Sequence, residues 1–502
     1  MKITIDILAV SILGFFIQNT TLAATVAPSA ALPDSLADTT AVPDDTQAQP
    51  VATSSTSLPG ALADTSAVPD DTQAQPAVKP TVNRESGTAD HANALQKLAE
   101  QGVLLRANLI NQYSRNTRGG VGQGHTNVGQ FNIGADLDLD KLVGTHGSSF
   151  HFTVYKDYGT GLSHDVTGTF PKQQNIYKNE YPAWHLGLFA FEQKLLDDRL
   201  DVTVGRLGTT AYYAKLPTNC QFQTGDNCGV PRLINSESGY SLLPSATWAI
   251  NMRYRTTPHT YVESGVYEVN PTTAASNGLD FSTSQATGVT VPLEWGWSQP
   301  GKFDLKVGGY VSTAPHTDPY YNTAGRSLGT YGGTADEANK ERKGVYLLGD
   351  KVVWRPGADS PRNLAVFGGV VQQLEDEEIM KQQFLSGAVL TGPLAARPHD
   401  TIGFSASLFT LTDKEIAYLR DARAKAGGSG SNDPHEYSME LNYGWHVSPG
   451  IIVMPNIQYI IHPDNSGLAK TAVLPKNMLV YGLNLQISFG GMFGLSSPGG
   501  GD

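Results

Sequence analysis

Hydrophobic and polar side chains alternate with a period of two along most of the chain after Val103. This period is typical of β-strands that bury only one face. The last such segment, 478–489, has Val, Gly, Asn, Gln and Ser on one side and large apolar residues on the other. Its apolar side consists of Leu479, Tyr481, Leu483, Leu485, Ile487 and Phe489. The pattern predicts an all-β domain over residues 103–489.

Clusters of Gly, Pro, Asn and Asp divide this domain into about sixteen alternating segments. The segments begin near Leu104, Asn127, Ser148, Pro182, Leu200, Ala246, Tyr261, Gly288, Lys302, Gly344, Asn363, Gln383, Thr401, Tyr437, Ile451 and Met478. Short connections such as 256–260 lie between much longer ones such as 208–245 and 413–433. An even number of strands with this alternation of turns and loops is typical of a transmembrane antiparallel β-barrel of the bacterial outer membrane. A soluble β-sandwich would carry more Lys and Glu on its polar faces.

The composition agrees with a barrel and excludes other classes of protein. The 502 residues are 40% hydrophobic and 16% charged, and no apolar run of about 20 residues follows the N-terminus, which excludes a helical transporter. The formal net charge is −12 and the pI is near 5.4. Because nucleic-acid phosphates require a basic face, no nucleic-acid partner is expected.

The N-terminal residues read as export and spacer segments. Residues 1–23 contain Lys2, an apolar run from Ile7 to Ile17 and a small residue, Ala23, at the expected cleavage site. This arrangement predicts a secretory signal peptide. Residues 24–87 are rich in Ala, Pro, Thr, Ser and Asp and hold a tandem duplication, 36–50 repeated as 62–76. Such a composition predicts a disordered linker. A role as a periplasmic tether or a partner-binding arm is the open alternative.

Three further segments carry local predictions. Residues 88–102 form either a short plug or docking helix or merely the end of the linker, with Gly102 as the stop. Residues 490–502 form a glycine-rich tail. In an exported protein, Cys220 and Cys228 are expected to form a disulfide across a short surface loop, with free thiols as the alternative.

Several stretches resemble the carbohydrate-selective porin family (OprB-type) of the bacterial outer membrane. The likeness covers about Leu95 to Phe489. It is carried by the order and spacing of Leu98–Gly102, Gly119-Gly120, Asp201–Arg206, Cys220–Pro231, Pro244–Trp248, Gly265–Pro271, Pro292–Glu294, Arg397–Asp400 and Pro455–Pro463. The resemblance implies a sixteen-stranded barrel that admits glucose-like sugars. The family's opening Trp-Gly-Gly-x-Arg piece is absent where Thr88 to Asn93 stand, and the long linker is an addition.

A sugar pore must offer hydrogen bonds that replace hydration and still release the solute. Carboxylates accept from hydroxyl groups, guanidinium groups donate, and aromatic rings pack on the apolar face of a sugar. Two criteria select the pore candidates: an inward-facing position in the alternation along a strand, and a place in the family-like motifs. The candidates are Glu294, Arg253, Glu263, Arg206, Arg106, Arg255, Tyr267 and Tyr310. Arg206 takes an outward-facing position in this alternation, so it reaches the pore only through a bulge or a strand end; otherwise it anchors an inward-folded loop by ion pairing. The mixed signs predict no preference for acids.

The predicted function is passive diffusion of monosaccharides across the outer membrane, with no enzymatic activity, no cofactor and no functional metal. A porin for a polyol or an organic acid is the runner-up. A barrel enzyme would need a nucleophile motif that the chain lacks, and a surface-anchoring barrel would need a folded passenger. Expected partners are small carbohydrates, outer-membrane lipids and the barrel-assembly machinery, with a homo-oligomer left open.

Overall fold

The structure is a computed structural model that describes residues 94–176, 184–218, 221–227, 229–241, 244–338, 341–358 and 360–492. The expected signal peptide, linker and tail after residue 492 lie outside these residues, as do Cys220 and Cys228. Residues 94–100 are helical, and residues 88–93 of the expected helix also lie outside the described part. The domain boundaries and the disulfide therefore stay predictions.

Sixteen strands form a closed barrel, which confirms the predicted fold. They are β1 Val103–Gly120, β2 Gly124–Asp138, β3 Ser148–Gly159, β4 Trp184–Leu195, β5 Leu200–Leu207, β6 Thr247–Thr257, β7 Thr260–Val269, β8 Gly288–Gln299, β9 Phe303–Ser312, β12 Arg342–Trp354, β13 Asn363–Gln373, β14 Met380–Thr391, β15 Thr401–Leu411, β16 His435–Ser448, β17 Ile451–Ile461 and β18 Lys476–Ser488. Every predicted segment begins within about three residues of an observed strand, the usual uncertainty of such boundaries. The strand β18 ends at Ser488, and Phe489 begins a short helix instead of closing the strand.

The barrel is antiparallel throughout, and each strand pairs with its neighbour in the sequence except at two places. The strand β9 pairs with β12, because β10 (His316–Asn322) and β11 (Ala335–Ala338) form a separate two-stranded sheet. The strand β18 pairs with β1 and closes the barrel, leaving no free edge among the sixteen strands. Closure satisfies the backbone hydrogen bonds that a lipid environment cannot satisfy.

Helical segments lie outside the barrel wall or in its loops. They are α3 Leu139–Val143, α4 Arg232–Glu237, α5 Thr272–Ala275, α6 Leu328–Tyr331, α7 Asp413–Lys425 and α8 Phe489–Met492, with short turns at Ser163–Thr167, Thr209–Ala211 and Ser466–Leu468. The helix α7 begins after Thr412, whose side chain accepts a hydrogen bond from the backbone N–H of Glu415. Among the described residues, no helix has the length and hydropathy of a membrane span.

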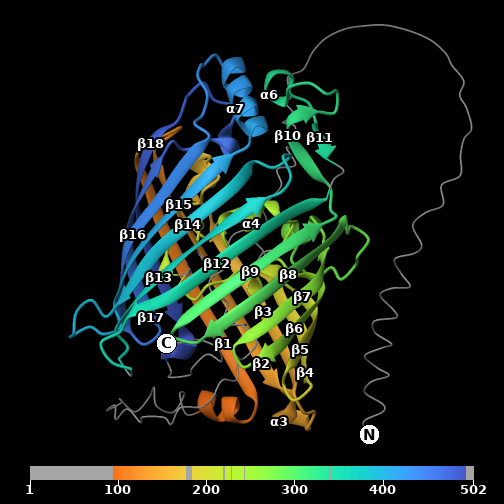
Figure 1. The fold of residues 1–502 in the computed structure, drawn as a ribbon, viewed down its shortest axis with the longest axis vertical. Helices are drawn as coiled ribbons and strands as arrows, with labels where there is room; N and C mark the ends of the chain where they lie inside the picture. Colours follow the sequence, from red (N-terminus) through yellow and green to blue (C-terminus); the bar gives the residue numbers. More distant parts are fainter. Residues whose placement is uncertain are drawn as a thin grey trace, which may run out of the picture. The chain divides into compact units, whose positions relative to one another are not determined.

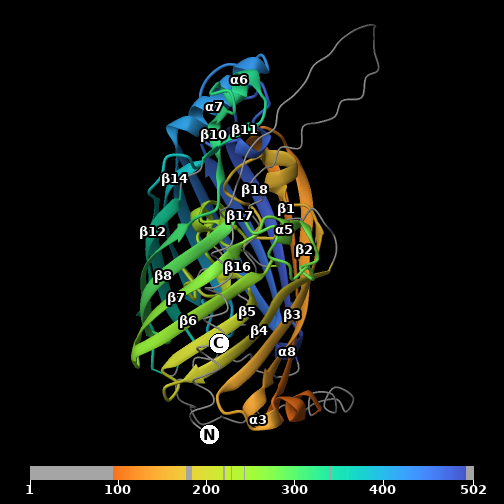
Figure 2. The same cartoon turned by 90° about the vertical axis from the view of Figure 1, so that its right-hand side faces the viewer.

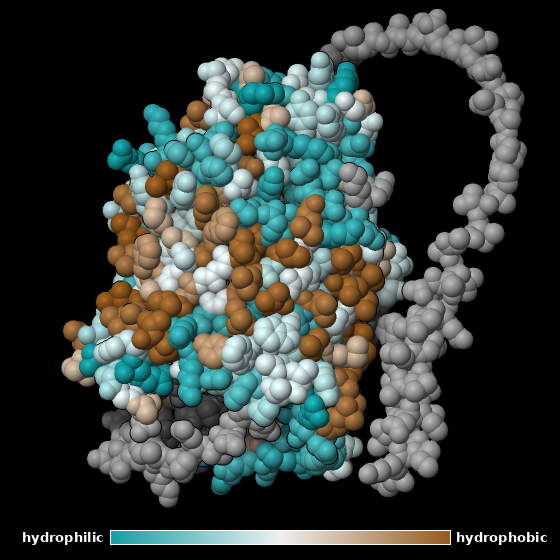
Figure 3. Space-filling view, in the orientation of Figure 1, coloured by the Kyte–Doolittle hydropathy of each residue, from teal (hydrophilic) through white to brown (hydrophobic). Residues whose placement is uncertain are grey.

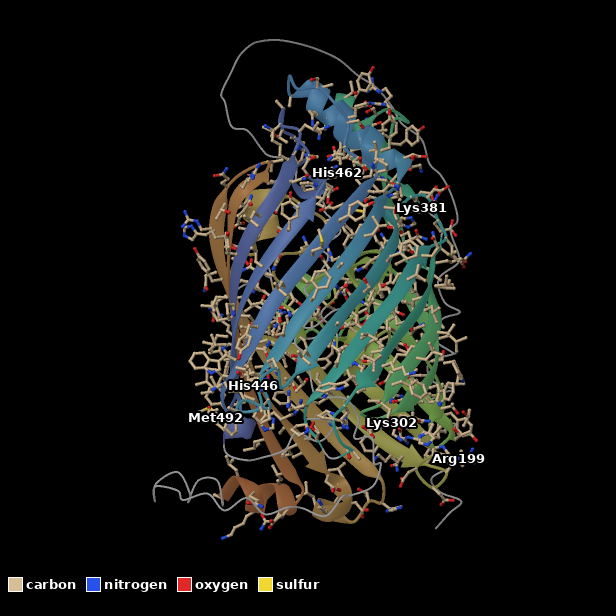
Figure 4. The ribbon with its side chains drawn as sticks, turned by 60° about the vertical axis from the view of Figure 1, so that its left-hand side comes forward. Arg199, Lys302, Lys381, His446, His462 and Met492 are labelled. Atoms are coloured by element: carbon tan, nitrogen blue, oxygen red, sulfur yellow. The ribbon has the colours of Figure 1, made fainter. Side chains whose placement is uncertain are left out.

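The two ends of the barrel differ in the length of their connections (Figure 1). One end carries short turns such as 258–259 and 449–450, together with Arg199, Lys302 and His446, and the opposite end carries His462 and Lys381 (Figure 4). The long loops, with α6, α7, β10 and β11, lie at this second end. In outer-membrane barrels the short turns face the periplasm and the long loops face the exterior.

Alternation places apolar side chains on the outer wall, as the sequence predicts. On β8 the exposed side chains are those of Val289, Val291, Leu293, Trp295 and Trp297, whereas Thr290 and Glu294 are fully buried. Apolar residues gather across the middle of the wall in the space-filling view (Figure 3). Such a band matches the outward-facing apolar belt of membrane barrels.

The inner wall is not uniformly polar, which differs from the prediction. On β12 to β15 the inward side chains include Leu348, Phe367, Leu385 and Phe409, all of them buried. They form a core with apolar residues of the β5–β6 connection, including Phe222 and other members of residues 208–246. The barrel therefore holds a hydrophobic core in its interior, and this core continues to Leu188 on β4 and to Tyr267 and Tyr310 on β7 and β9.

Candidate pore constriction

The connection between β5 and β6, residues 208–246, folds into the barrel and is called the inward loop below. Its apolar residues Leu216, Phe222, Leu233 and Ile234 are buried against the inner wall. Burial of such side chains contributes about 1.5–3 kcal/mol each. Apolar packing therefore keeps the inward loop inside the lumen, and hydrogen bonds fix its position.

Two buried glutamates anchor the inward loop on opposite sides of the lumen. Glu294 on β8 accepts a hydrogen bond from the backbone N–H of Ala214 at 2.7 Å. Glu440 on β16 accepts from the backbone N–H groups of Gln223 and Thr224 at 2.9 and 2.7 Å. Since β8 and β16 are well separated in the barrel order, the loop reaches across the interior and narrows the passage.

The β3–β4 connection, residues 160–183, also enters the lumen in its described part. The side chain of Gln174 donates to the carbonyl of Gln112 on β1 at 2.7 Å, and Gln458 on β17 donates to the carbonyl of Gln173 at 2.9 Å. This connection meets the inward loop, because the N–H of Lys172 donates to a carboxylate oxygen of Asp226 at 2.9 Å. Burial, together with the Arg232 guanidinium, lowers the pKa of Lys172 to about 7.

Three of the pore candidates, Arg253, Glu263 and Glu294, lie together on the adjacent strands β6, β7 and β8. The Arg253 guanidinium forms an ion pair with Glu263 at 2.8 Å and lies 4.4 Å from the ring centroid of Tyr261. The hydroxyl of Tyr261 in turn donates to Glu294 at 2.6 Å. Arg253 is 24% exposed, whereas Glu263 and Glu294 are 1% and 0% exposed. Only the arginine of this group presents surface to the lumen.

The other inward candidates occupy different positions. Arg255 pairs with Asp201 on β5 at 3.0 Å and is 22% exposed. Arg106 pairs with Asp136 at 2.8 Å on β1 and β2, which are separated from β6 by β3 to β5. The structure thus brings Arg253 and Arg255 together on one strand and leaves Arg106 on another part of the wall.

The tyrosine candidates point inward but are covered by the inward loop. Tyr267 and Tyr310 are 1% and 3% exposed, and both belong to the hydrophobic core. Their hydroxyls donate to Asn251 at 2.9 Å and to Gln373 at 2.8 Å. The expectation that these rings stack on sugar is therefore wrong for this arrangement, because buried rings offer no face to a solute.

Arg206 lies on the outer face of the wall, in line with its outward position in the alternation, which removes it from the pore candidates and from the role of anchoring an inward-folded loop. It pairs with Phe189 and Trp248 without a bulge, so it keeps the outward parity of its strand. Its guanidinium is fully buried and donates to the carbonyl of Asp280 at 3.1 Å, while the ring of Phe281 lies 5.6 Å away. Arg206 therefore holds the β7–β8 connection, residues 270–287, against the outside of the barrel (Figure 2).

Sequence reasoning missed two residues that position the site. Asn251 accepts hydrogen bonds from the hydroxyls of Tyr213 and Tyr267 and donates to Glu263 at 2.8 Å. Asn251 could have been found, because it has inward parity on β6 next to Arg253. Tyr213 could not, because the inward loop has no periodic pattern. Within the described residues, no group of three or more His, Cys, Asp and Glu side chains is arranged to hold a metal ion.

A comparison with protein families matches residues 122–489 to the carbohydrate-selective porins of the OprB family. The chain belongs to the OprB family. The match covers nearly all of the barrel: it includes β2 to β18, the inward loop, and Arg253, Glu263 and Glu294. This membership confirms the family predicted from the sequence motifs.

Known proteins of similar length support this membership. Porin B of Pseudomonas aeruginosa is 28% identical over 415 residues, which cover 78% of this chain and 89% of that protein. A protein of Acinetobacter baylyi named as the porin QuiX is 26% identical and covers 80% of this chain and 92% of its own. The high-pH structure of OprB from Pseudomonas putida is 27% identical, with a TM-score of 0.71, and the match covers 80% of this chain and 97% of that one.

Together, the closed sixteen-stranded barrel and the OprB membership identify an outer-membrane sugar porin. The barrel crosses the outer membrane many times through its strands. Its function is that of a channel, and its solutes are carbohydrates.

Proposed function

We propose that monosaccharide-sized sugars diffuse passively through the lumen that the inward loop narrows, and that Arg253 donates hydrogen bonds to the passing solute. The main support is the anchoring of the inward loop by Glu294 and Glu440 on opposite sides of the barrel. A narrowed, polar passage lets a small hydrated solute exchange water for protein hydrogen bonds. Longer sugars meet a steric barrier at the same place.

Arg253 fits the solute-contacting role better than the other candidates because of its support. Glu263 holds Nε and Nη2 of the guanidinium at 2.9 and 2.8 Å, and Asn251 holds Glu263 in turn. A donor fixed in this way loses little conformational entropy when it meets a hydroxyl group. Glu263 and Glu294 then act as positioning residues, because both are buried beneath the surface that a sugar would touch.

The remaining expectations belong to the same proposal. The protein acts without catalysing a reaction, its outer belt contacts outer-membrane lipids, and the barrel-assembly machinery inserts it. The apolar outward faces of strands such as β8 support the lipid contact.

Glucose block of the ion current through single channels in a planar bilayer tests the role of Arg253. We expect Arg253→Ala to weaken the block about five-fold, the value of one net hydrogen bond of about 1 kcal/mol. Arg115→Ala is the matched control, because Arg115 is exposed on β1 and pairs with Tyr481 on the outer face. An unchanged block in Arg253→Ala with a folded barrel would remove Arg253 from the sugar path.

A further inference from the structure

Burial separates the two signs of charge on the inner wall of β5 to β7. Arg253 and Arg255 are 24% and 22% exposed, whereas their partners Glu263 and Asp201 are 1% and 4% exposed. Lys306 and Glu294 on β9 and β8 show the same order, at 11% and 0%. The sequence contains both signs in similar number here, yet the surface offered to a solute on these strands consists mainly of cationic donors.

The two arginines follow one another along the direction of transport. They are separated by one residue on β6, so both point inward and lie about 7 Å apart along the strand. Asn251, the preceding inward residue, accepts from Tyr213 of the inward loop. Because β6 runs from the loop end toward the short turn at 258–259, a solute that passes the inward loop meets Arg253 first and Arg255 next.

Each guanidinium is paired with a buried carboxylate, Glu263 for Arg253 and Asp201 for Arg255. Arg253 is bound to Glu263 and lies over Tyr261, and Arg255 bonds to the carbonyl of Asp198 and pairs with Asp201. Such a fixed fork matches the geometry of a carboxylate better than that of a single hydroxyl. Two guanidinium groups in succession let a carboxylate pass from the first to the second while it keeps at least one hydrogen bond.

Carboxylates with some exposure lie on other parts of the inner wall. Asp136 on β2 is 17% exposed and is held by Arg106 at 2.8 Å and by His151 at 2.8 Å. Asp304 and Asp350 face each other on β9 and β12 and are half-buried. Asp304 is the second residue of β9, directly after the short turn, so it lies at the periplasmic mouth, beyond Arg253.

We propose that the channel also admits carboxylated sugars, such as aldonates and uronates, with Arg253 and Arg255 as two successive carboxylate-binding steps. This inference rests on the proposed sugar-porin function and extends its solutes to acidic sugars. It replaces the expectation from the sequence that mixed signs give no preference for acids. Burial of the partners, which the sequence does not display, reverses that conclusion.

The test compares gluconate with glucose in the full-length protein. Zero-current potentials under a gradient of potassium gluconate give the permeability ratio of gluconate to potassium, and liposome swelling gives the glucose rate. We expect measurable gluconate permeation, and we expect the double variant Arg253→Gln, Arg255→Gln to lower the ratio about ten-fold, as the loss of charge-assisted hydrogen bonds predicts. Glucose swelling should fall by a smaller factor, no more than about the five-fold expected from the loss of Arg253, since a neutral solute gains less from each donor.

Arg115→Gln is the matched control and should behave as the unaltered protein. If the double variant fails to fold, Arg255→Lys decides, because it keeps the charge and removes the fork; an unchanged ratio in that variant contradicts the inference. Glucose permeation without gluconate permeation, or an unchanged ratio in the folded double variant, overturns this inference alone. Exclusion of both solutes overturns the proposed function as well.

Discussion

Side chains that face the same way on neighbouring strands have different roles because their burial differs. Arg253, Glu263 and Tyr267 all point inward, yet only Arg253 has appreciable exposure. Parity could be derived from the sequence, because alternation along a strand fixes the face of each residue. Burial could not, because it depends on the inward loop, whose residues follow no periodic pattern in the sequence.

Arg206 illustrates the same limit on the outer face. Its parity was predicted, but its cover by Asp280 and Phe281 comes from the β7–β8 connection. A cation under an aromatic ring in a water-poor place contributes about 2 kcal/mol. Arg206 is therefore expected to stabilise this connection and to leave transport unaffected.

We predict that Arg206→Ala raises the rate of chymotrypsin cleavage after Phe281 about ten-fold, because the contacts that hold the connection against the wall are lost. Phe281 is already 42% exposed, so local release is sufficient for cleavage. Limited proteolysis in detergent, with Arg115→Ala as the control, measures this rate. A weakened glucose block in Arg206→Ala would instead place the residue in the pore.

Among the structural elements, the sixteen strands were predictable and the elements between them were not. Alternation and turn residues locate each barrel strand, whereas β10, β11, α4 and α7 lie in connections for which the sequence predicts only loops. The helix α7 has Thr412 as its N-cap, but its apolar residues are only weakly gathered on one face, so a helical period does not reveal it in the sequence. Tertiary contacts with α6 and β10 hold it instead.

The inward loop depends on Glu294 as an anchor. Glu294 accepts from the N–H of Ala214 and from the hydroxyls of Tyr261 and Tyr346. We predict that Glu294→Gln raises single-channel conductance and reduces discrimination by sugar size. The amide N–H groups of the glutamine would face groups that themselves donate, which destabilises the anchored position of the loop by about 1–3 kcal/mol. Glu192→Gln is the control, because Glu192 is buried on β4 and bonds to His151 instead of the loop. Unchanged conductance would show that other contacts suffice.

The helix α7 carries a buried carboxyl group whose protonation affects its packing. Burial, with the nearby Asp464 and Glu237 and opposed by a hydrogen bond from Ser466, raises the pKa of Glu415 to about 8. A raised carboxyl pKa means that the folded state holds the proton more tightly than the unfolded state, so stability falls as the pH rises from about 4.5 toward 8. The protonated form is the better packed one.

We predict that protease resistance of the connection 412–434 falls between pH 5 and pH 8 by about ten-fold or more, as the linkage relation requires for such a shift. Glu415→Gln should remove most of this pH dependence, since the amide is neutral throughout. Trypsin cleavage at Lys425 as a function of pH provides the measurement. An equal pH dependence in both proteins would assign the effect to other groups.

At the scale of the whole molecule, the closed barrel supplies the passage through the membrane and the inward loop limits its width. The barrel and its family could be predicted from alternation and from the ordered motifs. The partial filling of the lumen could not be predicted, because apolar residues at inward positions of β12 to β15 do not show in the sequence what packs against them. Its partner residues lie more than one hundred positions earlier in the chain.

Liposome swelling with a series of sugars of increasing length tests the central claim most directly. A lumen narrowed by the anchored inward loop predicts rapid swelling with glucose, slower swelling with disaccharides and very slow swelling with tetrasaccharides. The variant Glu294→Gln should reduce these differences. Equal rates for all sugars in the unaltered protein, or no swelling with glucose, would contradict the claim that this barrel is a size-limited sugar channel.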